Sequence, residues 1–220
     1  MSKGREDMKA FAVPGPLSDS ESDLRKRILG AAFQAFTKGG YAGTSTLQIA
    51  TRAKVSKRDL YAMFENKQAM LLACIKTHSD KMRMPADLPT PDTRDGLAAT
   101  LTAFGKNLLR ETSDPAVVAM FRLAISEAER SPEVAKAIDA CRDAARQTVS
   151  ALVAKAQSKG FLRAGRAREM ADLFLALLRE DLIMSLLLKV AARPGPLKIE
   201  QRATAATRIF LNVCGAPNDK

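Results

Sequence analysis

The chain has 220 residues, which suffice for one domain with a sizeable core or for a small domain joined to a larger one. Apolar residues make up 46% and charged residues 27%, so the composition excludes a collagen-like or wholly disordered chain. The 35 Lys and Arg residues against 24 acidic ones give a net charge of +11, which favours an acidic partner such as nucleic acid or an anionic membrane surface.

The composition also favours an all-α fold. Aromatic residues make up only 5% and there is no Trp, so little of the chain suits β-strands. Residues 1–17 contain Pro and Gly without apolar periodicity and are expected to form a disordered arm. Apolar residues then recur in three- and four-residue steps from Leu24 to Phe36, which predicts a helix over about 20–38 that ends at a Gly-Gly pair.

Two short helices joined by a tight turn are expected next. Hydroxyl residues at 44–46 offer N-caps to a two-turn helix over 47–53, in which Leu47 is expected to be buried. Ser56 caps another short helix over 57–63. Two short helices of which the second begins with cationic residues have the layout of a helix-turn-helix, which places its second helix in the major groove of DNA.

The rest of the chain is expected to be helical throughout. A helix begins at Lys67 and runs to about 84, and the Pro-rich segment 85–92 ends it and is the best candidate for a domain boundary. Further helices bring the expected total to about nine. They cover about 93–111, 115–129, 132–159, 166–192 and 197–213.

Small, aromatic and capping residues stand at fixed offsets between Ala35 and Leu71. They read Ala35-Phe36-x-x-Gly39-Gly40-Tyr41-x-Gly43-Thr44-Ser45, then Ile49-Ala50-x-x-Ala53-x-Val55-Ser56, then Leu60-Tyr61-x-x-Phe64-x-x-Lys67-x-x-Met70-Leu71. This pattern resembles the signature of the TetR family of transcriptional regulators nearly position for position. The strong match covers about a quarter of the chain, and the remainder is similar to the family in helix number and order.

The resemblance implies a three-helix DNA-binding head with a helix-turn-helix at 18–66. It also implies a larger helical domain for ligand binding and dimerisation at 67–220, with the helix at 67–84 connecting the two. The implied protein is a cytoplasmic, sequence-specific regulator, most often a repressor, that binds a palindromic operator in double-stranded DNA as a homodimer. Binding of a small-molecule effector, whose identity the sequence does not give, would cause the protein to release the operator.

Two residues depart from the family pattern. Lys54 stands in the turn where family members usually carry Gly because the backbone there can require positive φ, so we expect a mildly strained or an altered turn. Asp59 replaces a small or hydroxylated residue at the third position of the second short helix. A carboxylate there is repelled by phosphate but can accept a hydrogen bond from cytosine N4, so it could encode a sequence preference.

Residues 24–67 hold nine Lys and Arg against two acids, and we expect DNA to bind there. Arg58 is favoured for contact with guanine, while the hydroxyl residues at 44–46 and Lys67 lie at helix N-termini that can hold a phosphate. Taken alone, the hydroxyl residues at 44–46 could be plain caps, and Lys57 and Arg58 could be an ordinary solvated pair. The predicted DNA-binding residues are Thr44, Ser45, Thr46, Ser56, Lys57, Arg58, Asp59, Lys67 and, by resemblance, Tyr61.

The helix expected over 166–192 is too apolar for one buried face, because 17 of residues 170–192 are Ala, Val, Ile, Leu, Met or Phe. We expect one side of it to face its own core. The other side is expected to pack, with the helix over 197–213, against the same pair of a second subunit in a four-helix interface, as in the family.

The remaining helices are expected to enclose an effector cavity, as the resemblance implies. The same side chains could equally be plain core, and the sequence does not decide between the two. The candidate lining residues are Phe104, Leu108, Met120, Phe121, Cys141, Met170, Phe174 and Met184.

Two other classes of protein fit the sequence less well. An enzyme is disfavoured because the single histidine, His78, has no companion nucleophile and there is no Gly-rich phosphate loop. The three scattered cysteines argue against a disulfide framework and a zinc site, so no metal or cofactor is expected. Five charged residues within 170–192 argue against a membrane span. A basic protein that coats DNA without sequence preference, or binds a membrane surface, remains the alternative.

Overall fold

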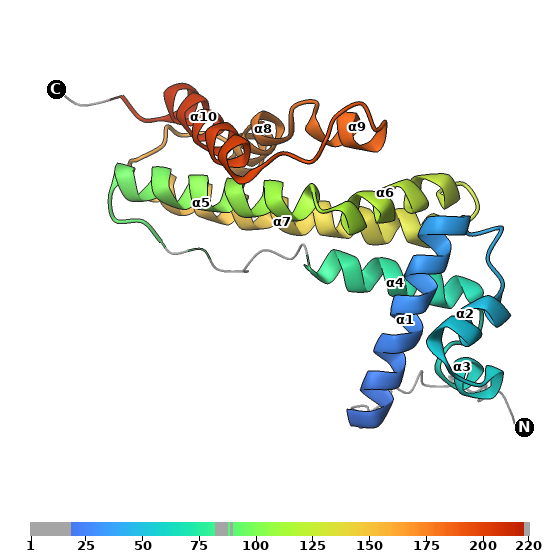
Figure 1. Cartoon of the computed structure of the whole chain (residues 1–220). Helices are drawn as coiled ribbons and strands as arrows, with labels where there is room; N and C mark the ends of the chain where they lie inside the picture. Colours follow the sequence, from blue (N-terminus) through green and yellow to red (C-terminus); the bar gives the residue numbers. More distant parts are fainter. Residues whose placement is uncertain (1–18, 82–87, 89, 218–220) are drawn as a thin grey trace, which may run out of the picture.

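The computed structural model describes residues 19–81, 88 and 90–217, which form ten α-helices and no β-strand (Figure 1). The expected all-α fold, with a head of short helices before a larger helical part, is confirmed. The predicted arm at 1–17 and residues 82–87, where the sequence predicts the end of the fourth helix, lie outside the described residues. The helices are α1 (Asp19–Gly39), α2 (Thr46–Ala53), α3 (Lys57–Met63), α4 (Lys67–Lys81), α5 (Arg94–Thr112), α6 (Pro115–Glu127), α7 (Pro132–Ser158), α8 (Ala167–Arg179), α9 (Leu182–Leu187) and α10 (Pro196–Cys214).

We call α1 to α4 the head, since α4, the predicted connecting helix, packs in one core with the three helices before it, and the two short helices of the head each begin with a reciprocal cap. The hydroxyl of Ser45 accepts a hydrogen bond from the Gln48 N–H at 3.2 Å, and the Gln48 side-chain oxygen accepts one from the Ser45 N–H at 2.8 Å. Ser56 and Asp59 form the same arrangement at the start of α3. The buried side chains of the head include Ile28, Phe36, Ile49, Leu60, Met70 and Ile75.

The larger part is layered. Figure 1 shows α8 to α10 in one layer above α5 to α7, with the head at the end of the molecule where α6 lies. α10 packs against α5 and α8, and α8 packs against α7. At their centre, the ring of Phe174 lies 6.4 Å from that of Phe104 and 5.4 Å from that of Phe210. Within the described ranges, no helix combines the length and the apolar character needed to cross a membrane.

The prediction of one helix over 166–192 is wrong, because the chain breaks between α8 and α9. Glu180 adopts φ 43° and ψ −126°, which no helix interior accommodates. Arg202 of α10 stabilises this break by donating hydrogen bonds to the carbonyls of Leu178, at 2.9 Å, and Arg179, at 3.2 Å. These carbonyls lie at the end of α8 and lack helical donors, so the arginine replaces the next turn of the helix.

Candidate nucleic-acid interface and effector cavity

The first turn of α3 exposes two cationic side chains to solvent, while the apolar side of the helix is buried. Lys57 and Arg58 are exposed at the first two positions of the helix. Behind them Leu60 is fully buried and Phe64 is 4% exposed, so the helix is fixed to the head by its apolar side. This geometry allows the first turn of α3 to enter a groove of DNA without exposing the core.

Asp59 has a structural role that the sequence reading missed. Its carboxylate accepts hydrogen bonds from the hydroxyl of Ser56, at 2.7 Å, and from the Ser56 N–H, at 3.3 Å. The Asp59 N–H in turn donates to the Ser56 hydroxyl oxygen at 3.0 Å. The signal was present as Ser-x-x-Asp, the spacing of a capping box. A base contact by Asp59 stays a prediction, and the carboxylate now has a second function.

The turn between α2 and α3 contains the expected strain. Lys54 adopts φ 55° and ψ 50°, the left-handed conformation that favours glycine, so this prediction is confirmed. Arg27 of α1 donates hydrogen bonds to the carbonyls of Ala53, at 3.2 Å, and Lys54, at 3.1 Å. Arg27 thereby supplies donors to two carbonyls at the end of α2. These hydrogen bonds stabilise a turn whose left-handed conformation is less favourable for lysine than for glycine.

The N-terminus of α2 lies next to α3. The hydroxyls of Thr46 and Tyr61 are 3.1 Å apart and share a hydrogen bond, and Tyr61 is 48% exposed. Leu47 was predicted to be buried and is instead 56% exposed. Residues 47 and 49 cannot share one face of a two-turn helix, and the core takes Ile49. Leu47 is therefore an apolar side chain on the same surface as the predicted phosphate contacts.

Thr44 and Lys67 direct their polar groups into the head. The Thr44 hydroxyl donates to the carbonyls of Gly40, at 2.8 Å, and Ala35, at 3.1 Å, and its side chain is buried. The Lys67 ammonium donates to the carbonyls of Tyr41, at 2.9 Å, and Thr44, at 3.0 Å, and lies 4.3 Å from the centre of the Tyr41 ring. Both residues thus hold the segment that leads into α2, and their contacts with DNA stay predictions.

A cavity of about 420 Å³ lies in the larger part, in the volume range of small-molecule sites. Of the predicted lining residues, Leu108, Phe121, Cys141 and Met184 border it. The other four are buried elsewhere in the core and do not line it. Phe104, Met170 and Phe174 belong to the core of the larger part, and Met120 belongs to that of the head. The remaining lining residues are Thr112, Ile125, Ile138, Arg142, Ala145, Arg179, Glu180, Ile183 and Leu187.

An exposed apolar stripe runs along α10. Leu197, Ile209 and Val213 are 69%, 42% and 48% exposed, and they lie with the half-buried Ala205 on one row of four-residue steps, which Gln201 interrupts. On the neighbouring α8, Leu173 and Leu177 are half-buried. These faces lie on the two segments in which the sequence predicts the dimer interface.

Two family models match the chain. Residues 28–74 match the family described as "Bacterial regulatory proteins, tetR family". Residues 99–216, more than half of the chain, match the "AefR-like transcriptional repressor, C-terminal domain".

Individual relatives agree with these matches. The chain is 27% identical over 153 residues to the HTH-type transcriptional regulator YvkB of Bacillus subtilis, covering 70% of this chain and 78% of YvkB. It is 31% identical over 131 residues to the HTH-type transcriptional activator FasR of Mycolicibacterium smegmatis, covering 58% of this chain and 59% of FasR. The solved structure titled Flavonoid-responsive Regulator FrrA superposes with a TM-score of 0.72 at 28% identity, covering 88% of this chain and 98% of that one.

Proposed function

Because the chain belongs to the TetR family of transcriptional regulators, we propose that it is a sequence-specific repressor that binds a palindromic operator as a homodimer and releases it when a small molecule fills the cavity. The observation that carries this proposal is the exposed, cationic start of α3 above its buried anchors. Residues 18–66 would serve DNA binding and 67–220 ligand binding and dimerisation, with α4 as the connection. A regulator of chromosomal DNA would act in the cytoplasm.

The exposed stripe of α10 supports a homodimer. Its large apolar side chains, Leu197, Ile209 and Val213, face solvent in the single chain, which costs free energy that a second copy would recover. A two-fold axis through α8 and α10 would repeat the two helix-turn-helix units at a fixed spacing. Such a pair matches two half-sites of an inverted repeat.

Two adjoining faces of α6 support coupling between the cavity and the head. Val117, Met120 and Ala124 are buried in the core of the head. Phe121 and Ile125, on the adjoining face of the same helix, border the cavity, and Phe121 also packs against the core of the head. A ligand that moves α6 would therefore change the packing under α1 and α4, and with it the spacing of the two α3 helices in a dimer.

The sign of regulation is proposed from the family. The matching C-terminal family is described as that of a transcriptional repressor, whereas FasR is named an activator. We propose repression because the C-terminal match covers more than half of the chain. A reporter gene downstream of the operator should be silenced when the protein is expressed, and higher reporter output would contradict this part of the proposal.

The test of DNA recognition is selection from a random duplex library with the purified protein, followed by affinity measurements at physiological salt. We expect an enriched inverted repeat to bind at least about 10³-fold more tightly than a shuffled duplex. A basic protein without sequence preference would show steep salt dependence and no enrichment. That outcome would replace our proposal with the alternative.

A further inference from the structure

Two arginines that lie close enough to repel each other border the cavity beside a largely apolar wall. Leu108, Phe121 and Ile183 are among the side chains that form the wall. Arg142 of α7 and Arg179, the last residue of α8, border the same space. A cavity of this composition suits a molecule with an apolar body and one charged end.

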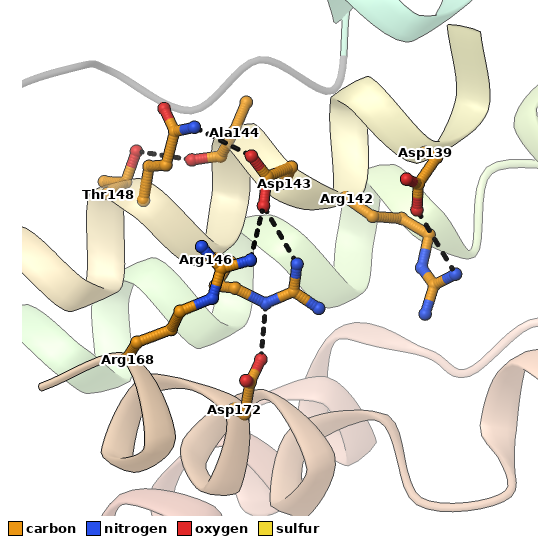
Figure 2. Close-up of polar contacts among 9 residues, drawn as sticks. Asp139, Arg142, Asp143, Ala144, Arg146, Thr148, Arg168 and Asp172 are labelled. Carbon is orange, nitrogen blue, oxygen red and sulfur yellow. Dashed lines mark hydrogen bonds and ion pairs between the residues drawn. The ribbon is translucent and has the colours of Figure 1, made fainter. Parts of the chain in front are cut away.

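Three neighbouring arginines of α7 and α8, Arg142, Arg146 and Arg168, are paired with carboxylates (Figure 2). Arg146 of α7 lies 2.9 Å from Asp143 and 2.5 Å from Asp172 of α8, and these contacts lower the pKa of Asp143 and raise that of Arg146. Arg168 also reaches Asp143, at 3.3 Å. In this cluster, two arginines and two aspartates therefore neutralise one another without a ligand.

Arg179 differs from its neighbours. Its half-buried guanidinium makes no hydrogen bond or ion pair with any residue in the described part of the chain. Burial lowers the pKa of Arg179, and repulsion from Arg142 and Arg146 lowers it further, against the opposing charge of Asp172. Arginine nevertheless remains charged at neutral pH. Its charge is thus poorly solvated and uncompensated, which is costly in the empty protein and favours an anion.

The acidic residue that borders the cavity, Glu180, does not neutralise the charge of Arg179. Glu180 borders the cavity, but its carboxylate lies 2.5 Å from the guanidinium of Arg202 and is therefore already compensated. Among the residues that the structure describes, the carboxylate paired with Arg142 is that of Asp139 on its own helix, 3.8 Å away, so the guanidinium can also bind a second acceptor.

We propose that the cavity binds an amphipathic carboxylate, an aryl or acyl acid whose apolar body contacts the wall and whose carboxylate pairs with Arg179 and Arg142. This inference rests on the proposed function, in which the cavity holds the effector, and it names the chemical class. The carboxylate supplies the two acceptor oxygens that a guanidinium takes in parallel hydrogen bonds. Ile125 and Met184, both exposed and bordering the cavity, lie where such a molecule would enter.

The test compares acids with neutral molecules of the same shape. Calorimetric titration of the full-length protein uses decanoate and 2-naphthoate as probes, each against its primary amide. We expect at least one acid to bind roughly tenfold or more tightly than its amide, because a charge-assisted pair is stronger than a neutral hydrogen bond. Equal affinity of acid and amide, or no binding of any probe up to about 1 mM, overturns the assignment.

Substitutions of Arg179 measure the contribution of its charge to binding separately from that of the cavity's shape. Arg179→Gln should bring the acid down to the affinity of the amide while leaving amide binding within about twofold, and Arg179→Lys should keep part of the preference. Arg166→Gln is the matched control, since Arg166 precedes the same helix at its other end and does not border the cavity. A preference for the acid that survives Arg179→Gln contradicts the proposal.

A separate measurement distinguishes this inference from the function on which it rests. Operator binding by the ligand-free protein depends on α3 and not on the acid. If the operator binds but the acid shows no preference, the ligand class is wrong and the proposed regulator stands. If no operator is found, the proposed function fails whichever probe binds.

Discussion

The carboxylate of Asp59 and the hydroxyl of Ser56, 2.7 Å apart, close a reciprocal cap at the start of the helix that we expect to read DNA. The cap fixes the first turn of α3, which carries Lys57 and Arg58 into solvent. The residue for which the sequence suggests a role in base preference thus also fixes the position of its neighbours.

Asp59→Ala should therefore destabilise the head and Asp59→Asn should not. The alanine removes the acceptor for the Ser56 N–H and hydroxyl, at an expected loss of about 1 kcal/mol in the free energy of unfolding. The asparagine keeps an acceptor oxygen at the same place. Denaturant titration measures both, and wild-type stability of Asp59→Ala would show that the cap contributes nothing.

Arg58→Ala should flatten base preference at one position of each half-site. A bidentate contact between arginine and guanine contributes about 1–3 kcal/mol of discrimination, and alanine cannot replace it. Library selection with the variant measures this directly. Arg130→Ala, an exposed arginine outside α1 to α4, is the control and should leave the selected sequence unchanged. A loss of affinity that is the same for every base at that position would show that Arg58 contacts phosphate and not a base.

Lys67→Met should weaken both the fold and operator binding. The variant keeps the apolar stem of the side chain but loses the donors to the carbonyls of Tyr41 and Thr44. We expect a loss of about 1–2 kcal/mol in the free energy of unfolding and lower affinity for all DNA sequences alike, because the N-terminus of α2 is no longer held. Lys136→Met, at an exposed position of α7, is the control. Unchanged stability of Lys67→Met would mean that water replaces these bonds at no cost.

Most helix boundaries could be predicted because local signals mark them. Gly, Pro and hydroxyl residues stand at the ends of the elements, and α6 begins at Pro115 with Asp114 as its N-cap, as the sequence indicates. The break before α9 could not be predicted. It depends on Arg202, whose guanidinium reaches the last carbonyls of α8 from more than 20 positions further along the chain.

The same limit explains what was missed at the sites. Arg27 caps α2 from α1, and Arg122 of α6 donates to the carbonyls of Leu186 and Leu187 at the end of α9. A sequence pattern shows the cation but not the distant carbonyl that receives it. For the cavity, periodicity identifies Phe104 and Leu108 as apolar positions of one helix. Both side chains are buried in the same core, and only the packing of the surrounding helices decides that Leu108 also borders the cavity while Phe104 does not.

The three cysteines should differ in reactivity toward iodoacetamide at pH 8. Burial raises the pKa of Cys74 to about 12, so only about one thiol in 10⁴ is ionised, and its sulfur is fully buried. Burial also raises the pKa of Cys214. Cys141 is half-buried at the cavity and should be alkylated first, as mass spectrometry of the peptides would show. In denaturant all three should react. Labelling of Cys74 as fast as Cys141 in the folded protein would contradict the packing of α4 on α1.

Ile209→Asp should convert the proposed dimer to a monomer. The substitution places a charge within the α10 stripe, where a partner subunit would bury it without compensation. Val190→Asp changes a more exposed apolar residue that lies off the stripe and should leave the dimer intact. Light scattering during size-exclusion chromatography compares the two. If the Ile209→Asp variant were still a dimer, the interface would not include this face of α10.

The molar mass of the complex between the protein and a duplex carrying one selected inverted repeat tests the central claim most directly. The account predicts two chains on each duplex, bound together, and weak binding of Ile209→Asp to the same DNA because a single head holds too few contacts. One chain on each duplex at saturation, with full affinity for an isolated half-site, would contradict it.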